Sequence, residues 1–83
     1  MADRALSPHQ VLIAPREPLV AGGAAEEYER RVSDLFTSGC RHLIADLRAV
    51  PAIDSAGVRA VETDAETFVA FTLLIARHGQ NNG

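Results

Sequence analysis

One serine, Ser55, stands where the sequence changes from strand-like to helix-like, and it is the residue best placed for chemistry. Asp54 precedes it and Gly57 follows two positions later, so a hydroxyl and a carboxylate stand together at the expected start of a helix. A phosphate at a helix N-terminus is stabilised by the free amides and the dipole, by roughly 0.3 to 1 kcal/mol per favourable charge. On these residues alone, however, capping of the helix by Asp54 or Ser55 is the simpler interpretation.

A second kind of chemistry at Ser55 is nucleophilic catalysis. Residues 53–57 match the G-x-S-x-G nucleophile elbow except in the first place, where Ile53 replaces the glycine that the sharp turn needs. The histidines His9, His42 and His78 are scattered without an evident acid partner, and 83 residues are too few for the usual hydrolase sheet. The single cysteine and the distant histidines also lack the spacing of metal ligands. We therefore expect no enzymatic activity, no cofactor and no metal.

Two elements are expected to position Ser55, a buried strand before it and an amphipathic helix after it. Residues 42–47 form a short apolar run, typical of a strand covered on both faces, and Pro51 then interrupts regular structure. After Ser55 the period changes, because apolar residues follow at steps of three, four and three and so share one face of a helix. These residues are Val58, Val61, Ala65 and Phe68.

Upstream, the pattern predicts a further strand and a further helix. Residues 10–14 are a short predicted strand after a disordered leader at 1–9, and two prolines then exclude a central strand or helix. From Ala24 the chain is predicted to be helical, with i, i+4 Glu-Arg pairs on its wet side and Gly39 as its C-terminal stop. The apolar stripe of this helix consists of Tyr28, Val32, Leu35 and Phe36.

Residues 68–77 are ambiguous between a strand and a continuation of the helix. The segment 71–76 has the β-branched and apolar content of a buried strand, but neither Gly nor Pro separates it from the helix before it. We favour a strand, because one continuous helix of roughly 22 residues would be unusually long. Parallel strands joined across helices would place residues 54–55 at the carboxyl end of a strand, where such sheets carry functional residues. The predicted fold class is therefore α/β, a small mixed sheet with helices packed on it.

The segment 46–60 resembles the STAS domain of anti-sigma factor antagonists. In that family a strand ends in an Asp-Leu pair, a short loop follows, and an Asp-Ser dipeptide leads into a helix through a nearby Gly. Here these are Asp46-Leu47, the loop 48–53, Asp54-Ser55 and Gly57. With Asp46-Leu47 in register upstream, a switch at Ser55 is preferred to a simple cap.

This resemblance implies a role for each residue of the motif. Ser55 would be phosphorylated by a partner that is both an anti-sigma factor and a serine kinase, with ATP bound by that partner. The unmodified segment Asp54, Ser55, Ala56 and Gly57 would bind the partner, while Asp46 and Leu47 would give structural support. Relatives often carry a second hydroxyl residue where Ala56 stands, so this motif has a single acceptor.

The resemblance also implies what surrounds the motif. Family domains continue past the last predicted strand, so residues 10–77 would be a truncated STAS-like domain with its C-terminal helices missing, followed by a frayed tail at 78–83. One sheet face is then expected to be uncovered, and a homodimer or a larger partner is expected to cover it. The segment 16–19 is at best a degraded form of the family's early turn. The acidic residues Glu62, Asp64 and Glu66 also depart from the family, which is often neutral or basic there.

Composition narrows the class of protein further. The chain is 47% hydrophobic and 23% charged, as in a folded domain, and its net charge of -3 gives no basic footprint for nucleic acid. The single cysteine, Cys40, excludes an internal disulfide and is expected to be a small buried apolar side chain. The chain carries neither a signal-peptide core nor a run of 18 apolar residues. We therefore expect a cytoplasmic protein that binds no membrane.

Two other functions remain open at this point. The first is a STAS scaffold subunit that is never phosphorylated and assembles into a sensory, transport or lipid-trafficking complex. The second is a degenerate gene product that keeps only a remnant of the motif. A substitution of Ser55 by Asp separates the first from the switch, because a scaffold should tolerate an exposed acidic side chain. A cooperative thermal transition would argue against the second.

Overall fold

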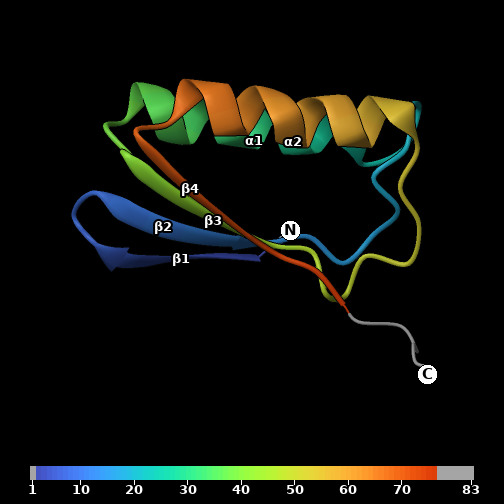
Figure 1. Cartoon of the computed structure of the whole chain (residues 1–83), viewed down its shortest axis with the longest axis horizontal. Coiled ribbons are helices and arrows are strands. Elements are labelled where there is room, and N and C mark those ends of the chain that lie inside the picture. The colour runs from blue at the N-terminus through green and yellow to red at the C-terminus, as the bar shows by residue number, and fades with distance from the viewer. Residues whose placement is uncertain (1, 77–83) are drawn as a thin grey trace.

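A four-stranded mixed sheet carries two helices on one of its faces (Figure 1). The structure is a computed structural model and describes residues 2–76 of the chain. Its elements, in chain order, are β1 (Ala2–Ser7), β2 (Gln10–Ala14), α1 (Ala25–Thr37), β3 (His42–Asp46), α2 (Ser55–Thr67) and β4 (Ala70–Leu74). The prediction of a small α/β fold is confirmed.

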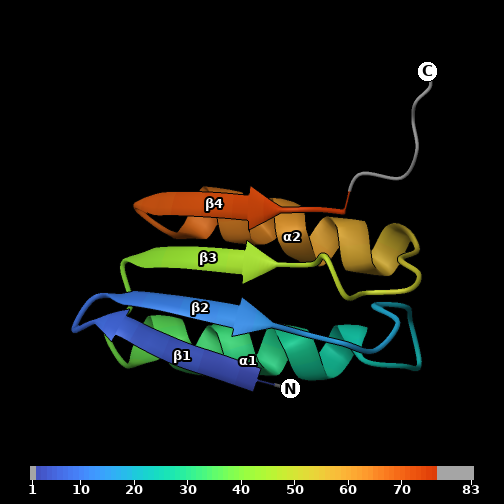
Figure 2. The ribbon, with the colours of Figure 1, turned by 90° about the horizontal axis from the view of Figure 1, so that it is seen from below.

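The strands lie in the order β1-β2-β3-β4, with both helices behind the sheet in Figure 2. The pair β1/β2 is antiparallel, whereas β2/β3 and β3/β4 are parallel, so α1 and α2 are the crossovers of two consecutive βαβ units. The strand predicted at 10–14 is confirmed, and the one predicted at 42–47 is confirmed as far as Asp46, where β3 ends. The ambiguous segment contains β4, so a strand follows α2 rather than a longer helix.

The core lies between the sheet and the helices. Alternation along the strands turns Ile13, Leu43 and Ala45 toward the helices, which present Tyr28, Val32 and Ala60 among their buried residues. Cys40 joins this cluster, and burial raises the pKa of its thiol, as expected for a small apolar side chain that keeps its proton. Gly39 has φ +104°, a backbone conformation that suits glycine, and ends α1 as predicted.

The disordered leader predicted at 1–9 is wrong over its described part, because residues 2–7 are strand β1. This strand pairs with β2 through a short hairpin, and Asp3 forms an ion pair with Arg31 of α1. The sequence of β1 is short, mixed and poor in β-branched residues, so its order comes from the neighbouring strand and helix rather than from local propensity. The tail predicted at 78–83 lies outside the described residues.

The buried face of α2 is shifted by one residue from the predicted face. Val58 is 44% exposed and Ala65 is also exposed, whereas Gly57, Ala60 and Asp64 are buried. The predicted stripe is therefore wrong at Val58 and Ala65, whereas Val61 is partly buried against the core and Phe68 is buried. Two tertiary contacts select the other face, the approach of Gly57 to Leu19 and a hydrogen bond from Tyr28 to Asp64.

The sheet face opposite the helices is left uncovered by residues 2–76, as the sequence predicts (Figure 1). His42 crosses this face in a polar ladder, with its Nδ1 2.8 Å from the Gln10 amide nitrogen and its Nε2 3.1 Å from the Thr72 hydroxyl. Leu12, Ile44 and Leu74 are half-buried beside it. This face is thus part polar and part apolar, and the homodimer expected to cover it stays a prediction.

Candidate functional site

Ser55 is the first residue of α2 and its side chain is exposed. It follows the loop that leaves β3, at the end of the molecule where the parallel strands finish (Figure 2). This is the edge at which open α/β sheets place their ligand sites. The structure therefore puts the Asp-Ser pair where the sequence predicts it.

The N-terminus of α2 is capped by Asp54 and not by Ser55. The Oδ1 atom of Asp54 accepts hydrogen bonds from the backbone amides of Ala56 at 2.9 Å and Gly57 at 3.1 Å. Its Oδ2 atom accepts a third from the backbone amide of Ala21 at 3.0 Å. These bonds, led by the one from Ala21, lower the pKa of Asp54 below its ordinary value. The cap thus also holds the turn before α1 against the start of α2.

Because Asp54 supplies the cap, the Ser55 hydroxyl has no structural hydrogen bond among residues 2–76. Arg59 lies one turn further along α2 on the same face, at the i, i+4 spacing that lets side chains meet. Both side chains are exposed. The site therefore consists of a free hydroxyl at a helix N-terminus, with a guanidinium within one turn.

Gly57 does not take part in the surface that the sequence predicts for partner binding. It is buried, and a Cβ atom at this position would lie 2.2 Å from the Leu19 carbonyl oxygen and 2.6 Å from Cγ1 of Ile53. A partner backbone therefore has no room to approach over Gly57, because the chain's own backbone occupies that space. Ala56 is half-buried, so the exposed part of the segment is mainly Ser55.

A short parallel bridge between Leu19 and Ile53 fixes the loop before Ser55. The Leu19 amide donates to the Ala52 carbonyl at 2.9 Å, and the Asp54 amide donates to the Leu19 carbonyl at 3.3 Å. Leu19 is fully buried. From the sequence, the segment 16–19 is interpreted only as a degraded form of the family's early turn. In the structure, Leu19 of this segment holds the loop that leads to Ser55 in place.

Asp46 and Leu47, the expected structural support, hold the other end of the loop. Both carboxylate oxygens of Asp46 accept hydrogen bonds from the Arg48 guanidinium at 2.9 Å, and this pairing lowers the pKa of Asp46. Leu47 is buried, and its amide donates to the Leu74 carbonyl of the β4 strand at 2.8 Å. The loop from β3 to α2 is thus anchored at both of its ends.

A buried tyrosine-aspartate pair is the feature that sequence reasoning missed. The sequence names Asp64 only as one of three acidic residues that depart from the family, whereas the structure buries it to 5% exposure, and its Oδ2 accepts a hydrogen bond from the Tyr28 hydroxyl at 2.6 Å. Burial, helped by the nearby charge of Glu29, raises the pKa of Asp64 to about 6 against the pull of the tyrosine hydrogen bond. The spacing of Asp64 from Ala60 and Phe68, four residues on either side, is the signal that places it on the buried face.

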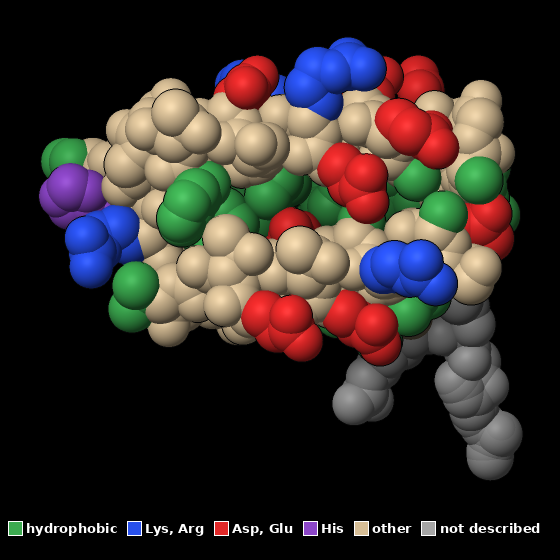
Figure 3. Space-filling model, turned by 90° about the horizontal axis from the view of Figure 1, so that it is seen from above, with side chains coloured by type: hydrophobic (Ala, Val, Ile, Leu, Met, Phe, Trp, Pro, Cys, Tyr) green, Lys and Arg blue, Asp and Glu red, His purple; other side chains and the backbone are tan. Residues whose placement is uncertain are grey.

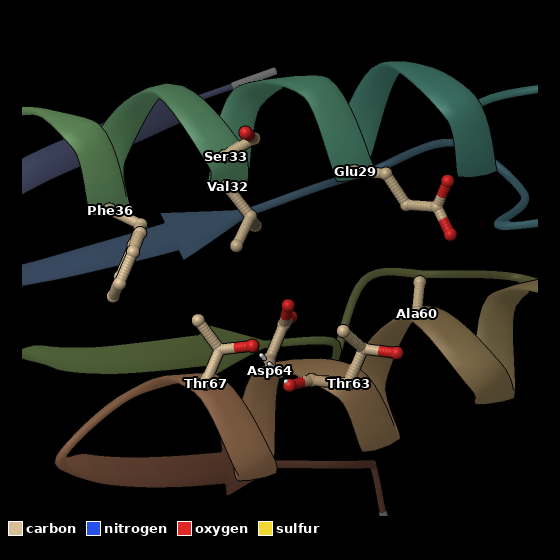
Figure 4. A pocket seen from close by; sticks show the side chains of 8 residues that line it. All are labelled: Glu29, Val32, Ser33, Phe36, Ala60, Thr63, Asp64 and Thr67. Atoms are coloured by element: carbon tan, nitrogen blue, oxygen red, sulfur yellow. Dashed lines mark hydrogen bonds between the residues drawn. The ribbon is translucent and has the colours of Figure 1, made fainter.

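Asp64 borders a hollow between α1 and α2, here called the inter-helix groove (Figure 3). The hollow has a volume of about 230 Å³ and is open to solvent along the two helices. Figure 4 shows Asp64 pointing from α2 toward α1, with Phe36 and Glu29 extending from α1 at the two ends of the groove. Its other lining residues are Val32, Ser33, Ala60, Thr63 and Thr67.

The two described histidines lie far from Ser55. His9 accepts backbone hydrogen bonds from Arg41 and His42, which places both histidines at the amino end of the β3 strand, opposite the start of α2. His78 lies outside the described residues. Ser55 is therefore not brought to an imidazole within residues 2–76. In the same range, groups of three or more potential metal-ligating side chains do not occur.

Comparisons of this chain with protein-family models, with curated proteins and with solved structures found no match. The STAS resemblance therefore depends on the motif residues of the sequence alone. Neither helix within residues 2–76 has the length and apolar content of a membrane span.

Proposed function

We propose that this chain is a cytoplasmic regulator of transcription, an anti-sigma factor antagonist switched by phosphorylation of Ser55. Its partner would be an anti-sigma factor with serine kinase activity, which binds the chain when Ser55 is unmodified. The observation that carries the proposal is the cap of α2. Asp54 makes both cap hydrogen bonds, so the exposed Ser55 hydroxyl is free to be modified without loss of a bond that holds the fold.

Phosphorylation at this position would change the surface and leave the fold intact. The phosphate adds about -1.5 to -2 charges, and the first-turn amides and dipole of α2 favour that charge. Arg59, at the i, i+4 position, offers a guanidinium to the new oxygens. An acidic or apolar partner surface that had docked over Ser55 would be repelled. The switch therefore works by charge at the contact and needs no conformational change.

The first test is intact-mass spectrometry after incubation with ATP and a candidate anti-sigma kinase. We expect the wild-type chain to gain one phosphate, the Ser55→Ala variant to gain none, and Ser38→Ala, a control at the other end of the molecule, to behave as wild type. A cooperative thermal transition for each variant shows that it is folded. If the folded wild-type chain gains no phosphate, the result contradicts the switch and favours a scaffold subunit that is never phosphorylated.

Partner binding gives the second readout of the same proposal. We expect Ser55→Asp to weaken binding of the partner by about tenfold or more, since like charges across an interface cost several kcal/mol. Ser38→Asp, which adds the same charge at the carboxyl end of α1, should leave the affinity unchanged. Affinities are measured by titration of each variant with the purified partner. Equal affinity of Ser55→Asp and wild type would contradict the switch.

A further inference from the structure

We propose that the inter-helix groove is a binding site for an organic cation, an ammonium or guanidinium group on a short apolar stem. The groove lies between α1 and α2 and is lined by Asp64, Glu29 and Phe36 among others (Figure 4). The proposal does not depend on Ser55, which does not line the groove.

The first argument is the state of the Asp64 carboxylate. Asp64 is only 5% exposed. Yet only one of its carboxylate oxygens, Oδ2, accepts a hydrogen bond from a described residue, Tyr28. A carboxylate can accept about four hydrogen bonds, and buried polar atoms in native proteins are nearly always satisfied. The side chain points into the groove (Figure 4). An N–H donor placed in the groove would give the second oxygen its partner.

The second argument is charge. Glu29 lines the groove from α1, its charge raises the pKa of Asp64, and none of the described residues that line the hollow is basic. Among the described residues, the arginines that form ion pairs do so elsewhere, Arg31 with Asp3 and Arg48 with Asp46. Two carboxylates without a counter-charge favour a cationic occupant, because an opposite charge stabilises both ionised forms.

The third argument is the shape and the remaining wall of the groove. Phe36 is 51% exposed and is held edge-on to Phe68, with ring centroids 5.6 Å apart, and its ring lines the same groove as the two carboxylates. Aromatic faces attract cations, and arginine more often than lysine. Val32 and Ala60 provide apolar contact for a stem. The volume of about 230 Å³ lies below the 300 to 1,000 Å³ usual for drug-sized ligands, so a group the size of one side chain fits.

The experiment is a titration of the folded chain with butylguanidinium, followed by amide chemical shifts in nuclear magnetic resonance spectra. Butylurea, which has a similar shape without the charge, is the matched ligand control. We expect saturable shifts along the facing sides of α1 and α2 with butylguanidinium and at least about tenfold weaker binding of butylurea, the loss expected when a charge-assisted hydrogen bond is removed. Equal binding of the two ligands would overturn the proposal.

Two variants locate the site. Asp64→Asn should weaken butylguanidinium binding about tenfold, while Glu29→Gln should weaken it several-fold, because the exposed carboxylate acts through a screened charge. Glu62→Gln removes the same charge from α2 outside the groove and should leave the affinity unchanged. An unchanged affinity in both Asp64→Asn and Glu29→Gln, with folded proteins, would refute a site at the groove.

A third ligand identifies the source of the cation. N-acetylarginine methylamide carries the same guanidinium within a peptide backbone. Binding as tight as that of butylguanidinium would mean that the groove accepts an arginine side chain of another protein. If butylguanidinium binds and the blocked arginine does not, the site accepts only free small cations. Failure of both ligands to produce saturable shifts would contradict the proposal as a whole.

Discussion

Replacing Gly57 with alanine is expected to destabilise the domain by about 2 kcal/mol, although the same change at an ordinary helix position is stabilising. The new Cβ atom would lie 2.2 Å from the Leu19 carbonyl oxygen, and that oxygen belongs to backbone that cannot rotate away. The start of α2 would have to move from Leu19, which would strain the Leu19–Ile53 bridge and the cap at Asp54. Urea unfolding of both proteins measures the difference.

The matched control exchanges the same two residue types at an exposed position of the same helix. Ala65→Gly should lower the free energy of unfolding by about 1 kcal/mol, because glycine is the poorer helix former. Alanine is thus preferred at 65 and glycine at 57. An 83-residue domain has a total stability of roughly 4 to 12 kcal/mol, so a loss of about 2 kcal/mol at Gly57 lowers the melting temperature by roughly 8 to 16 °C. A Gly57→Ala variant as stable as wild type would show that Leu19 does not pack on α2.

Much of the frame around Ser55 could be predicted because its signals are local. The apolar run of β3, the change of period after Ser55 and the carboxylate before it are read from neighbouring residues. They predicted the β3 strand, the start of α2 and a cap from either Asp54 or Ser55. The structure decides between the two capping residues, because Asp54 accepts the hydrogen bonds of both amides.

The errors concern contacts between residues far apart in the chain. Tyr28 and Asp64 are 36 positions apart, and no local pattern shows that the tyrosine hydroxyl will meet that carboxylate. Gly57 and Leu19 are also far apart in the sequence, and their close approach turns Val58 outward. Strand β1 is ordered by pairing with its neighbour rather than by its own composition. Periodicity alone placed the buried face of α2 one residue away from its position, because these contacts outweigh it.

The Tyr28–Asp64 pair connects stability with the proposed cation site. A charged carboxylate held at 5% exposure with one hydrogen bond is unfavourable, which is why its pKa rises to about 6. A cation bound in the inter-helix groove would offset that cost and stabilise the folded state in proportion to its affinity. Removal of the charge should therefore raise stability while it weakens cation binding. Opposite changes in the two quantities are the signature of a residue kept for binding.

Substitution of Asp64 by asparagine is expected to raise the free energy of unfolding by about 2 to 3 kcal/mol near pH 7.5 and to change it little near pH 4. The folded pKa of about 6 lies above the ordinary value of 3.8, so the folded protein holds a proton that the unfolded chain has released. Stability from this group is therefore fully present below about pH 4 and is lost as the pH rises through about 6. The side-chain oxygen of asparagine can still accept the hydrogen bond from the Tyr28 hydroxyl, and the neutral amide avoids the cost of burying a charge.

Urea unfolding at several pH values between about 4 and 7.5 measures the difference between Asp64→Asn and wild type. The titratable groups near Asp64 are Tyr28 and Glu29, while Leu43 and Ala45 of the strand beneath are apolar. Burial and the neighbouring Asp64 raise the pKa of Tyr28 above its usual range. Tyr28 therefore keeps its proton throughout, and the difference curve reports mainly Asp64. Glu62→Gln, at an exposed position of α2, should give a flat difference close to zero. A difference for Asp64→Asn that does not vary with pH would show that the carboxylate is solvated, which would also remove the main argument for a cation in the groove.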